Sequence, residues 1–222
     1  MNQLIPYLAE KVIVEVTGKK KVAGKLIDVG PDILVLYHEE RYMYIPTIHV
    51  HQWTPAASDD NAADQQGEHG AMLHVDSITL LAVLQEAKGM FVEIGVGGSK
   101  PIHGFVQGIM NDYLIICSPI YNAVYVSLHH LKWLIPYPAS HLPYARSADT
   151  LSMKPLPPAL SRSFEERCKE EEGNMVVINL GGHSATLGVI KKVSGGIIEL
   201  VQASGSSTFM NMRHIKSIYA PK

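Results

Sequence analysis

An internal repeat is the feature that most constrains what this chain can fold into. Three glycines are each followed six residues later by another glycine, and the pairs are Gly18 with Gly24, Gly98 with Gly104, and Gly182 with Gly188. Further along each copy, an aromatic residue precedes a histidine by five positions, and the histidines are His49, His130 and His214. Each copy closes on a proline. Agreement at this many spacings predicts three tandem copies of one small structural unit.

Each copy follows the same order of elements. A short amphipathic helical segment comes first, around residues 3–10, 77–87 and 161–172. A β-branched strand leads to the first glycine, the second glycine lies in the next strand, and third strands are expected at 33–36, 113–116 and 197–200. A glycine inside a strand suits the sharp bend at which a small barrel closes. The sequence therefore predicts a mainly β chain of three tandem Sm/SH3-like five-stranded small barrels, each preceded by a short helix.

The repeats also set the expected domain boundaries. Repeat 1 spans residues 1–55, repeat 2 spans 77–137 and repeat 3 spans 161–222. The first connection, 56–76, has five acidic residues and no Lys or Arg, which is typical of a flexible acidic linker. The second connection, 138–160, contains five prolines and should be extended and stiffer.

Charge and cysteine content exclude several classes of function. The formal net charge is −2, so a nucleic acid or an anionic membrane is not an expected partner. Cys117 and Cys168 are far apart, form neither a disulfide framework nor a zinc pattern, and are expected to be buried thiols. The N-terminus lacks the features of a signal peptide and no apolar run is long enough to span a membrane, which predicts a protein kept inside the cell that makes it.

The repeated histidines are the most tempting candidates for chemistry. Because each occupies the same place in a separate barrel, the three should lie apart, and we interpret each as a strand-end imidazole bonded to a backbone carbonyl. Weak metal binding by the neighbouring pairs His49/His51 and His129/His130 stays open as an alternative.

Catalytic patterns do not appear in the sequence. The Gly97-Gly98 and Gly181-Gly182 pairs lack the Lys-Ser/Thr of a phosphate loop and are interpreted as hairpin turns. No nucleophile elbow is present. We therefore expect no enzyme, no catalytic residue, no metal and no cofactor.

Three aromatic residues near the ends of the repeats are candidate interface anchors, because aromatic side chains dominate interface energetics. They are Trp53, Trp133 and Tyr219. The alternative is that each packs against the helix of its own repeat.

Part of the repeat resembles the Sm/Hfq family. Gly24 followed by Asp32-Ile33-Leu34-Val35-Leu36 is similar to the first Sm motif, and residues 43–55 and 124–136 are similar to the second. The resemblance implies an RNA-contacting Lys-His near residues 45–46, 126–127 and 210–211. These positions are Ile-Pro, Val-Ser and Met-Asn. RNA binding in the manner of that family is therefore the alternative function and not the expected one.

The repeat resembles more strongly the N-terminal region of the spore outer coat protein B (CotB) family of endospore-forming bacilli, which also carries three such units. The shared features are the Gly-Gly turn, the glycine six residues on, and the closing segment His214-Ile215-Lys216-Ser217-Ile218 with its counterpart His130-Leu131-Lys132. Repeat 1 departs from them, with Thr17-Gly18 at the turn and His51 in place of the lysine.

The resemblance implies a structural component of the spore coat. It would be made in the mother-cell cytoplasm, deposited on the spore, and bound to other coat proteins and to itself, with exposed edge strands pairing between barrels. The Ser/Lys/Arg-rich tail of longer members has no counterpart in this sequence, so roles that depend on the tail are not implied.

Overall fold

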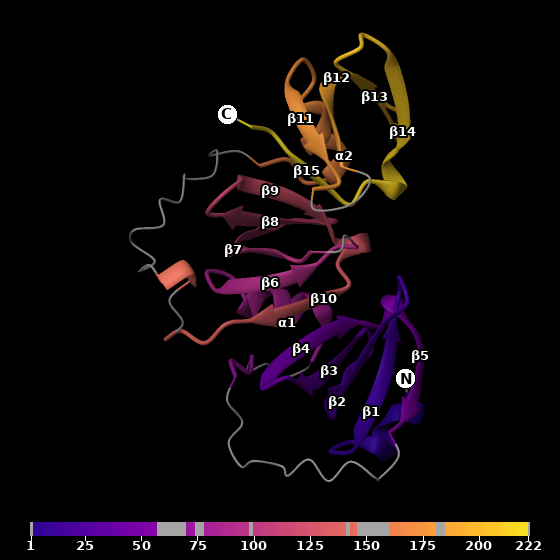
Figure 1. The fold of residues 1–222 in the computed structure, drawn as a ribbon, viewed down its shortest axis with the longest axis vertical. Coiled ribbons are helices and arrows are strands. Elements are labelled where there is room, and N and C mark those ends of the chain that lie inside the picture. Colours follow the sequence, from indigo (N-terminus) through magenta and orange to yellow (C-terminus); the bar gives the residue numbers. More distant parts are fainter. Residues whose placement is uncertain are drawn as a thin grey trace. The chain divides into compact units, whose positions relative to one another are not determined.

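The computed structural model describes residues 2–56, 70–73, 78–97, 100–140, 143–145, 160–180 and 185–221. Antiparallel strands dominate these residues and the helices are few and short, which confirms a mainly β chain (Figure 1). Two compact units are present: unit 1 is residues 1–94 with 132–141, and unit 2 is 95–131 with 142–222. Repeat 2 is therefore divided between them. In the described part of the chain, no helix is both long and apolar enough to cross a membrane.

Unit 1 holds repeat 1 together with the helix and the first and last strands of repeat 2. Its strands follow the hydrogen-bonded order β6-β10-β4-β3-β2-β1-β5. The elements are η1 (Asn2–Tyr7), β1 (Lys11–Val16), β2 (Lys20–Val29), β3 (Ile33–His38), β4 (Arg41–Pro46), η2 (Thr47–His49), β5 (Val50–Pro55), α1 (Leu80–Glu86), β6 (Phe91–Gly95) and β10 (Trp133–Pro136).

Unit 2 holds the middle strands of repeat 2 together with repeat 3. Its strands follow the order β14-β13-β12-β11-β15-β9-β8-β7. The elements are β7 (Ile102–Ile109), β8 (Tyr113–Ser118), β9 (Asn122–Ser127), η3 (Leu128–His130), η4 (Pro143–Ala145), α2 (Phe164–Lys169), β11 (Met175–Ile178), β12 (Thr186–Ser194), β13 (Ile197–Val201), β14 (Ser207–Asn211), η6 (Met212–His214) and β15 (Ser217–Tyr219).

Strand pairing among the described residues is open in both units and closes no barrel. One order nevertheless recurs: the fourth, third, second, first and fifth strands of a repeat lie side by side as β4-β3-β2-β1-β5 and as β14-β13-β12-β11-β15. The fourth strand of repeat 1 pairs with β10 of repeat 2, and the fourth strand of repeat 2, β9, pairs with β15 of repeat 3. The fourth strand of repeats 1 and 2 thus forms hydrogen bonds with the fifth strand of the following repeat and not with the fifth strand of its own repeat.

The second glycine of each repeat lies where two strands approach closely. A Cβ atom there would stand 2.5–2.6 Å from a backbone carbonyl oxygen of the third strand. The pairing between the second and third strands then shifts by one residue just beyond it, between Leu26 and Asp28, between Val106 and Gly108, and between Ile190 and Lys192. The irregularity thus lies at the same place relative to Gly24, Gly104 and Gly188 in all three repeats, and a β-bulge is a device that bends a strand.

The short helices follow from local signals. Ser163 and Glu166 form a capping box at the start of α2, and Thr79 caps α1 through a hydrogen bond from Ala82 N. The helical segment expected around residues 3–10 is the 3-10 helix η1 at Asn2–Tyr7. Pro6 lies inside it and has no N–H to donate, which disfavours an α-helix there.

Each unit has its own apolar core. Unit 1 buries Val14, Leu36 and Ile45 among others, and unit 2 buries Tyr113, Ile198 and Cys168 among others. Both cysteines are free and buried, as predicted from their isolation in the sequence. The interior of each unit includes residues from two repeats, so the repeats depend on each other for burial.

Candidate interaction surfaces

The junction between repeats 1 and 2 is a shared sheet and a shared core within unit 1. β4 runs antiparallel to β10, with Tyr44 opposite Leu134, and both side chains are buried. Trp133 of β10 belongs to the same core cluster as Val14 and Leu36 of repeat 1. The two repeats are therefore held together by the same burial that stabilises a domain interior.

Two polar contacts fasten this junction. The carboxylate of Asp32, in the loop before β3, accepts a hydrogen bond from Leu80 N at 2.9 Å, on the first residue of α1. Lys132 Nζ donates to the Thr17 carbonyl oxygen at 2.6 Å. Helix N-termini have unpaired N–H groups, and hydrogen bonds with one charged partner are stronger than neutral ones. Repeat 1 thus caps the helix of repeat 2, and repeat 2 reaches back to the first hairpin of repeat 1.

The junction between repeats 2 and 3, within unit 2, repeats the shared sheet. β9 pairs with β15, with Tyr125 opposite Ile218. The Arg167 guanidinium of α2 lies 4.4 Å from the centre of the Tyr125 ring, a cation–π contact. The Tyr113 hydroxyl donates to the Ser161 carbonyl oxygen at 2.7 Å, and burial raises the pKa of Tyr113 to about 12, which keeps this phenol a neutral donor.

The two polar fasteners recur at this second junction. Asp112 accepts a hydrogen bond from Phe164 N, the first residue of α2, at 2.8 Å. Lys216 Nζ donates to the Gly97 carbonyl oxygen at 3.4 Å. One arrangement of strand pairing, aspartate cap and lysine bridge therefore joins consecutive repeats twice in the chain.

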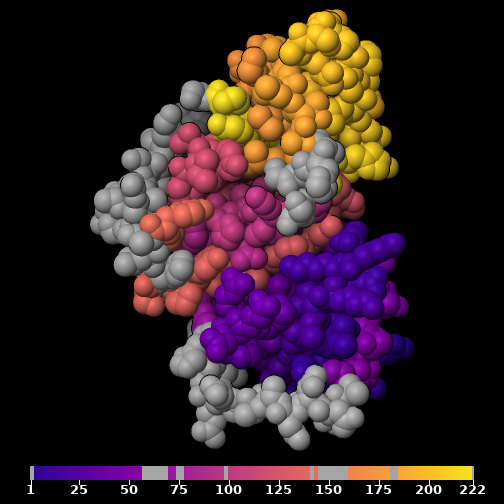
Figure 2. Space-filling view, viewed as in Figure 1, coloured from indigo at the N-terminus to yellow at the C-terminus, as the bar shows by residue number. Residues whose placement is uncertain are grey.

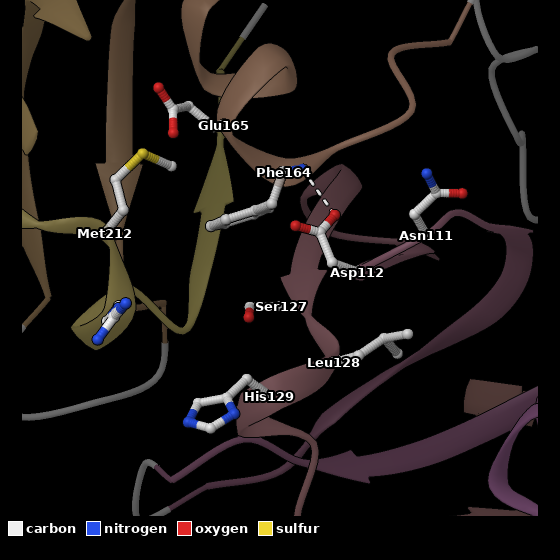
Figure 3. Close-up of a pocket in the computed structure, with 9 residues that line it drawn as sticks. Asn111, Asp112, Ser127, Leu128, His129, Phe164, Glu165 and Met212 are labelled. Carbon is white, nitrogen blue, oxygen red and sulfur yellow. Dashed lines mark hydrogen bonds between the residues drawn. The ribbon is translucent and has the colours of Figure 1, made fainter. Parts of the chain in front are cut away.

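A cleft of about 630 Å³ opens beside the second junction (Figure 3). Carboxylates, a guanidinium and apolar side chains share its wall, and the Asp112 carboxylate is already engaged by Phe164 N, as the dashed line in Figure 3 shows. Charges of both signs suit a peptide segment or a small amphipathic ligand better than a polyanion. The lining residues are Asn111, Asp112, Ser127, Leu128, His129, Phe164, Glu165, Met212 and Arg213.

The three repeated histidines occupy one equivalent position, the last residue of the turn between the fourth and fifth strands. His49 is buried, His130 is half-buried and His214 is exposed. His130 Nε2 lies 2.8 Å from the carbonyl oxygen of Arg213, so an imidazole N–H there donates to a carbonyl of the next repeat. Burial lowers the pKa of His130 and favours the neutral ring. Within the described ranges, no group of three or more His, Cys, Asp or Glu residues could hold a metal ion.

The candidate anchors lie on the fifth strands β5, β10 and β15, in different settings. Trp133 is buried in the core that repeat 1 shares with β10. The Tyr219 ring lies 5.5 Å from that of Tyr121 in repeat 2. The Trp53 ring packs edge-on at 4.9 Å against Tyr7 of η1, the helix of its own repeat. Two of the three therefore connect repeats inside the chain, and the third packs within repeat 1.

Among the other predicted repeat positions, Gly18 has a positive φ of 98° in the first hairpin turn. Gly98 and Gly182 lie outside the described residues, as do most of the acidic connection and most of the Pro-rich connection.

Two strands remain at the ends of the sheet orders. In the described structure β14, the fourth strand of repeat 3, pairs only with β13, and β5, the fifth strand of repeat 1, pairs only with β1. Phe209 of β14 is 68% exposed, whereas its counterparts Tyr44 and Tyr125 are 1% and 7% exposed. The yellow region of Figure 2, to which β14 belongs, lies at the surface of unit 2. The internal junctions pair a fourth strand with a fifth strand, and the described chain leaves one edge of a fourth strand (β14) and one edge of a fifth strand (β5) open.

Sequence reasoning missed the capping aspartates. Asp32 and Asp112 stand directly before the third strand at the same offset in two repeats, where repeat 3 has Gly196. That repeated offset was the available signal. The caps were hidden because the capped residues lie 48 and 52 positions further along the chain, beyond the reach of a local capping pattern.

These junctions define a class of protein: tandem β modules joined edge to edge, with the outermost edges open. Residues 163–218, which run from the cap of α2 into β15, match the family model described as YwrJ third domain. The whole chain is 33% identical over 225 residues to the "Uncharacterized protein YwrJ" of Bacillus subtilis (strain 168), with 100% of both chains covered. The chain belongs to the YwrJ family.

Proposed function

We propose that this protein is a non-catalytic structural component of the bacterial spore coat, acting by protein–protein assembly through its β modules. The observation that carries the proposal is the pair of open edges, β5 and β14, on a chain whose internal junctions are themselves edge pairings. An unpaired strand presents a row of N–H and C=O groups that another chain can bind. The likeness of the glycine spacings and of residues 214–218 to the CotB repeats supports the cellular setting.

We further propose that each module is an Sm-like unit whose fourth strand serves the neighbouring module. The recurring order of fourth, third, second, first and fifth strands supports this, as does the glycine-bearing, bulged second strand. Other coat proteins and a second copy of the chain are the proposed partners.

The charges favour assembly over RNA binding. RNA binding needs a basic face and gives a steep salt dependence. The net charge of the chain is −2, and the carboxylates of Asp112 and Glu165 share the cleft with Arg213. A polyanion would meet repulsion there as well as attraction.

The proposal is tested by fusing a fluorescent protein to the chain in a spore-forming bacillus under its own promoter. We expect fluorescence in the mother cell first, then a shell on the spore that survives mother-cell lysis and is removed with the coat by detergent and reductant. The free fluorescent protein from the same promoter is the control. Loss of the fusion at lysis, as for the free fluorescent protein, would contradict a coat role.

A further inference from the structure

We propose that the chain associates with a second copy of itself by pairing β14 of one copy with β5 of the other. The inference rests on the proposal that the protein acts by assembly, and it names the partner and the contact. At both internal junctions the fourth strand of one repeat pairs with the fifth strand of the next. Among the described residues, one fourth strand (β14) and one fifth strand (β5) are then left with one edge that no strand pairs with. The same rule, applied between copies, gives both of them a partner.

The position of Phe209 on β14 follows from the repeat. It precedes the repeated histidine by five residues, as Tyr44 does on β4 and Tyr125 does on β9. At the internal junctions this aromatic residue faces Leu134 and Ile218, respectively. The residue opposite Phe209 is therefore the one that occupies the same place on β5.

That residue is Trp53. On β15, Ile218 pairs with Ile178 of the first strand of its repeat. On β5, Trp53 pairs in the same way with Val14, which is equivalent to Ile178 because Val12 and Val176 both face the second glycine of their repeats. The register thus places Phe209 of one copy directly opposite Trp53 of the other.

The side chains at this contact suit an interface. Phe209 is a large apolar residue with 68% of its surface exposed, and Trp53 is half-buried. Directly opposed residues of an antiparallel pair lie on the same face of the sheet, and aromatic pairs there stabilise the pairing. Pairing would cover the Phe209 ring and supply hydrogen-bond partners to both edges.

The contact between copies lacks the two polar fasteners of the internal junctions. Gly196 stands where Asp32 and Asp112 cap a helix, and His51 stands where the other fifth strands carry a bridging lysine. Association is therefore weaker than the internal junctions, reversible and dependent on concentration.

Sedimentation velocity of the purified full chain over a concentration series tests the association. We expect reversible self-association, and Phe209→Asp should weaken it by at least roughly tenfold, as expected when a central aromatic is lost from an interface. The matched control is Leu187→Asp, because Leu187 is 54% exposed on β12, a strand paired on both sides. A wild-type chain that stays monomeric, or an equal loss in the control, would overturn the proposal.

Cysteine cross-linking tests the register without disturbing the aromatic pair. The rule places Thr208 of one copy opposite Thr54 of the other, so mixed Thr208→Cys and Thr54→Cys chains should form a disulfide-linked dimer on mild oxidation. In the control mixture, Gln52→Cys replaces Thr54→Cys. This position is displaced by two residues, where the Cα separation exceeds the reach of a disulfide. Equal yields in the two mixtures would refute the register, and no cross-link in either would refute the pairing.

These measurements separate this inference from the proposed function. A monomeric chain that still forms a shell on the spore would overturn the self-pairing and leave the coat role standing. A chain that pairs in solution but does not reach the spore would do the reverse.

Discussion

The strands β9 and β14 are the fourth strands of successive repeats, yet their surroundings differ. β9 is paired on both sides, and its Tyr125 is 7% exposed beneath the Arg167 guanidinium. β14 is paired on one side, and Phe209 at the equivalent position is 68% exposed. The difference teaches that the burial of the aromatic residue on a fourth strand is supplied by the neighbouring repeat, since Met210 of β14 still packs against the core of unit 2.

The sequence of the last repeat differs where a neighbour would be fastened. Asp112 caps the helix of the following repeat, and its counterpart in repeat 3 is Gly196. The backbone contact at this place is kept, since Leu128 N donates to the Asp112 carbonyl and Met212 N donates to the Gly196 carbonyl, each at 2.9 Å. This hydrogen bond is therefore common to the two repeats, whereas the turn differs, because Gly196 has a positive φ of 74° and Asp112 does not have a positive φ.

The largest difference in stability between the two strands is expected from replacing their equivalent aromatic residues. Tyr125→Ala should lower the free energy of unfolding by about 3 kcal/mol, because it opens a cavity in a buried junction. Phe209→Ala should change it by less than about 0.5 kcal/mol, because the ring is mostly in solvent. Urea unfolding at low protein concentration measures both. Similar losses for the two variants would show that β14 is not an open edge.

The aspartate cap should contribute less to the free energy of unfolding than the buried ring of Tyr125 does. Asp112→Ala removes the hydrogen bond to Phe164 N and should lower the free energy of unfolding by about 1 kcal/mol. Gly196→Asp, at the equivalent position of repeat 3, should not stabilise the isolated chain, because the φ of 74° at Gly196 disfavours a residue with a side chain. Thermal unfolding measures both, and a loss from Asp112→Ala no larger than that of an exposed Asp would contradict the capping role.

The two lysine bridges should contribute different amounts to the free energy of unfolding. Lys132 Nζ lies 2.6 Å from its carbonyl partner and Lys216 Nζ lies 3.4 Å from its own. Replacement by Met keeps most of the aliphatic stem, so Lys132→Met should cost roughly 1 kcal/mol and Lys216→Met less. Denaturant midpoints compare the two variants, and the reverse order would contradict the geometry.

The smallest expected effect is a pH dependence carried by His130. Burial lowers its pKa below the ordinary 6.5, while its hydrogen bond to the Arg213 carbonyl opposes the shift. The unfolded chain therefore binds the proton more readily, and the stability that the neutral ring contributes is lost as pH falls below the unfolded value of 6.5. His130→Gln should flatten the dependence of thermal stability on pH between neutral and mildly acidic pH, as measured by thermal unfolding over a pH series. A slope equal to that of the wild-type chain would contradict this assignment.

Much of the fold could be predicted because its signals are local. The third strands expected at 33–36, 113–116 and 197–200 lie within β3, β8 and β13. β-branched runs between glycine turns carry that information in themselves. The helical segment expected at residues 3–10 is the 3-10 helix η1, and Pro6 inside it disfavours an α-helix.

The candidate site was predicted only in part. Trp133 and Tyr219 each contact a preceding repeat of the same chain, and their role as interface anchors stays a prediction. The partners could not be predicted, because the cap from Asp32 to Leu80 joins residues far apart in sequence, and such a contact leaves no spacing pattern.

The amino-acid sequence by itself determined that there are three repeats and where their strands run, because β-branched runs and the spacing of the glycines are local properties of the sequence. Only the tertiary structure decided that each fourth strand pairs with the fifth strand of the next repeat, and that β14 and β5 are left over. The reason is physical: pairing between strands uses backbone N–H and C=O groups that every residue except proline carries, so the choice of partner is made by packing and not by a motif.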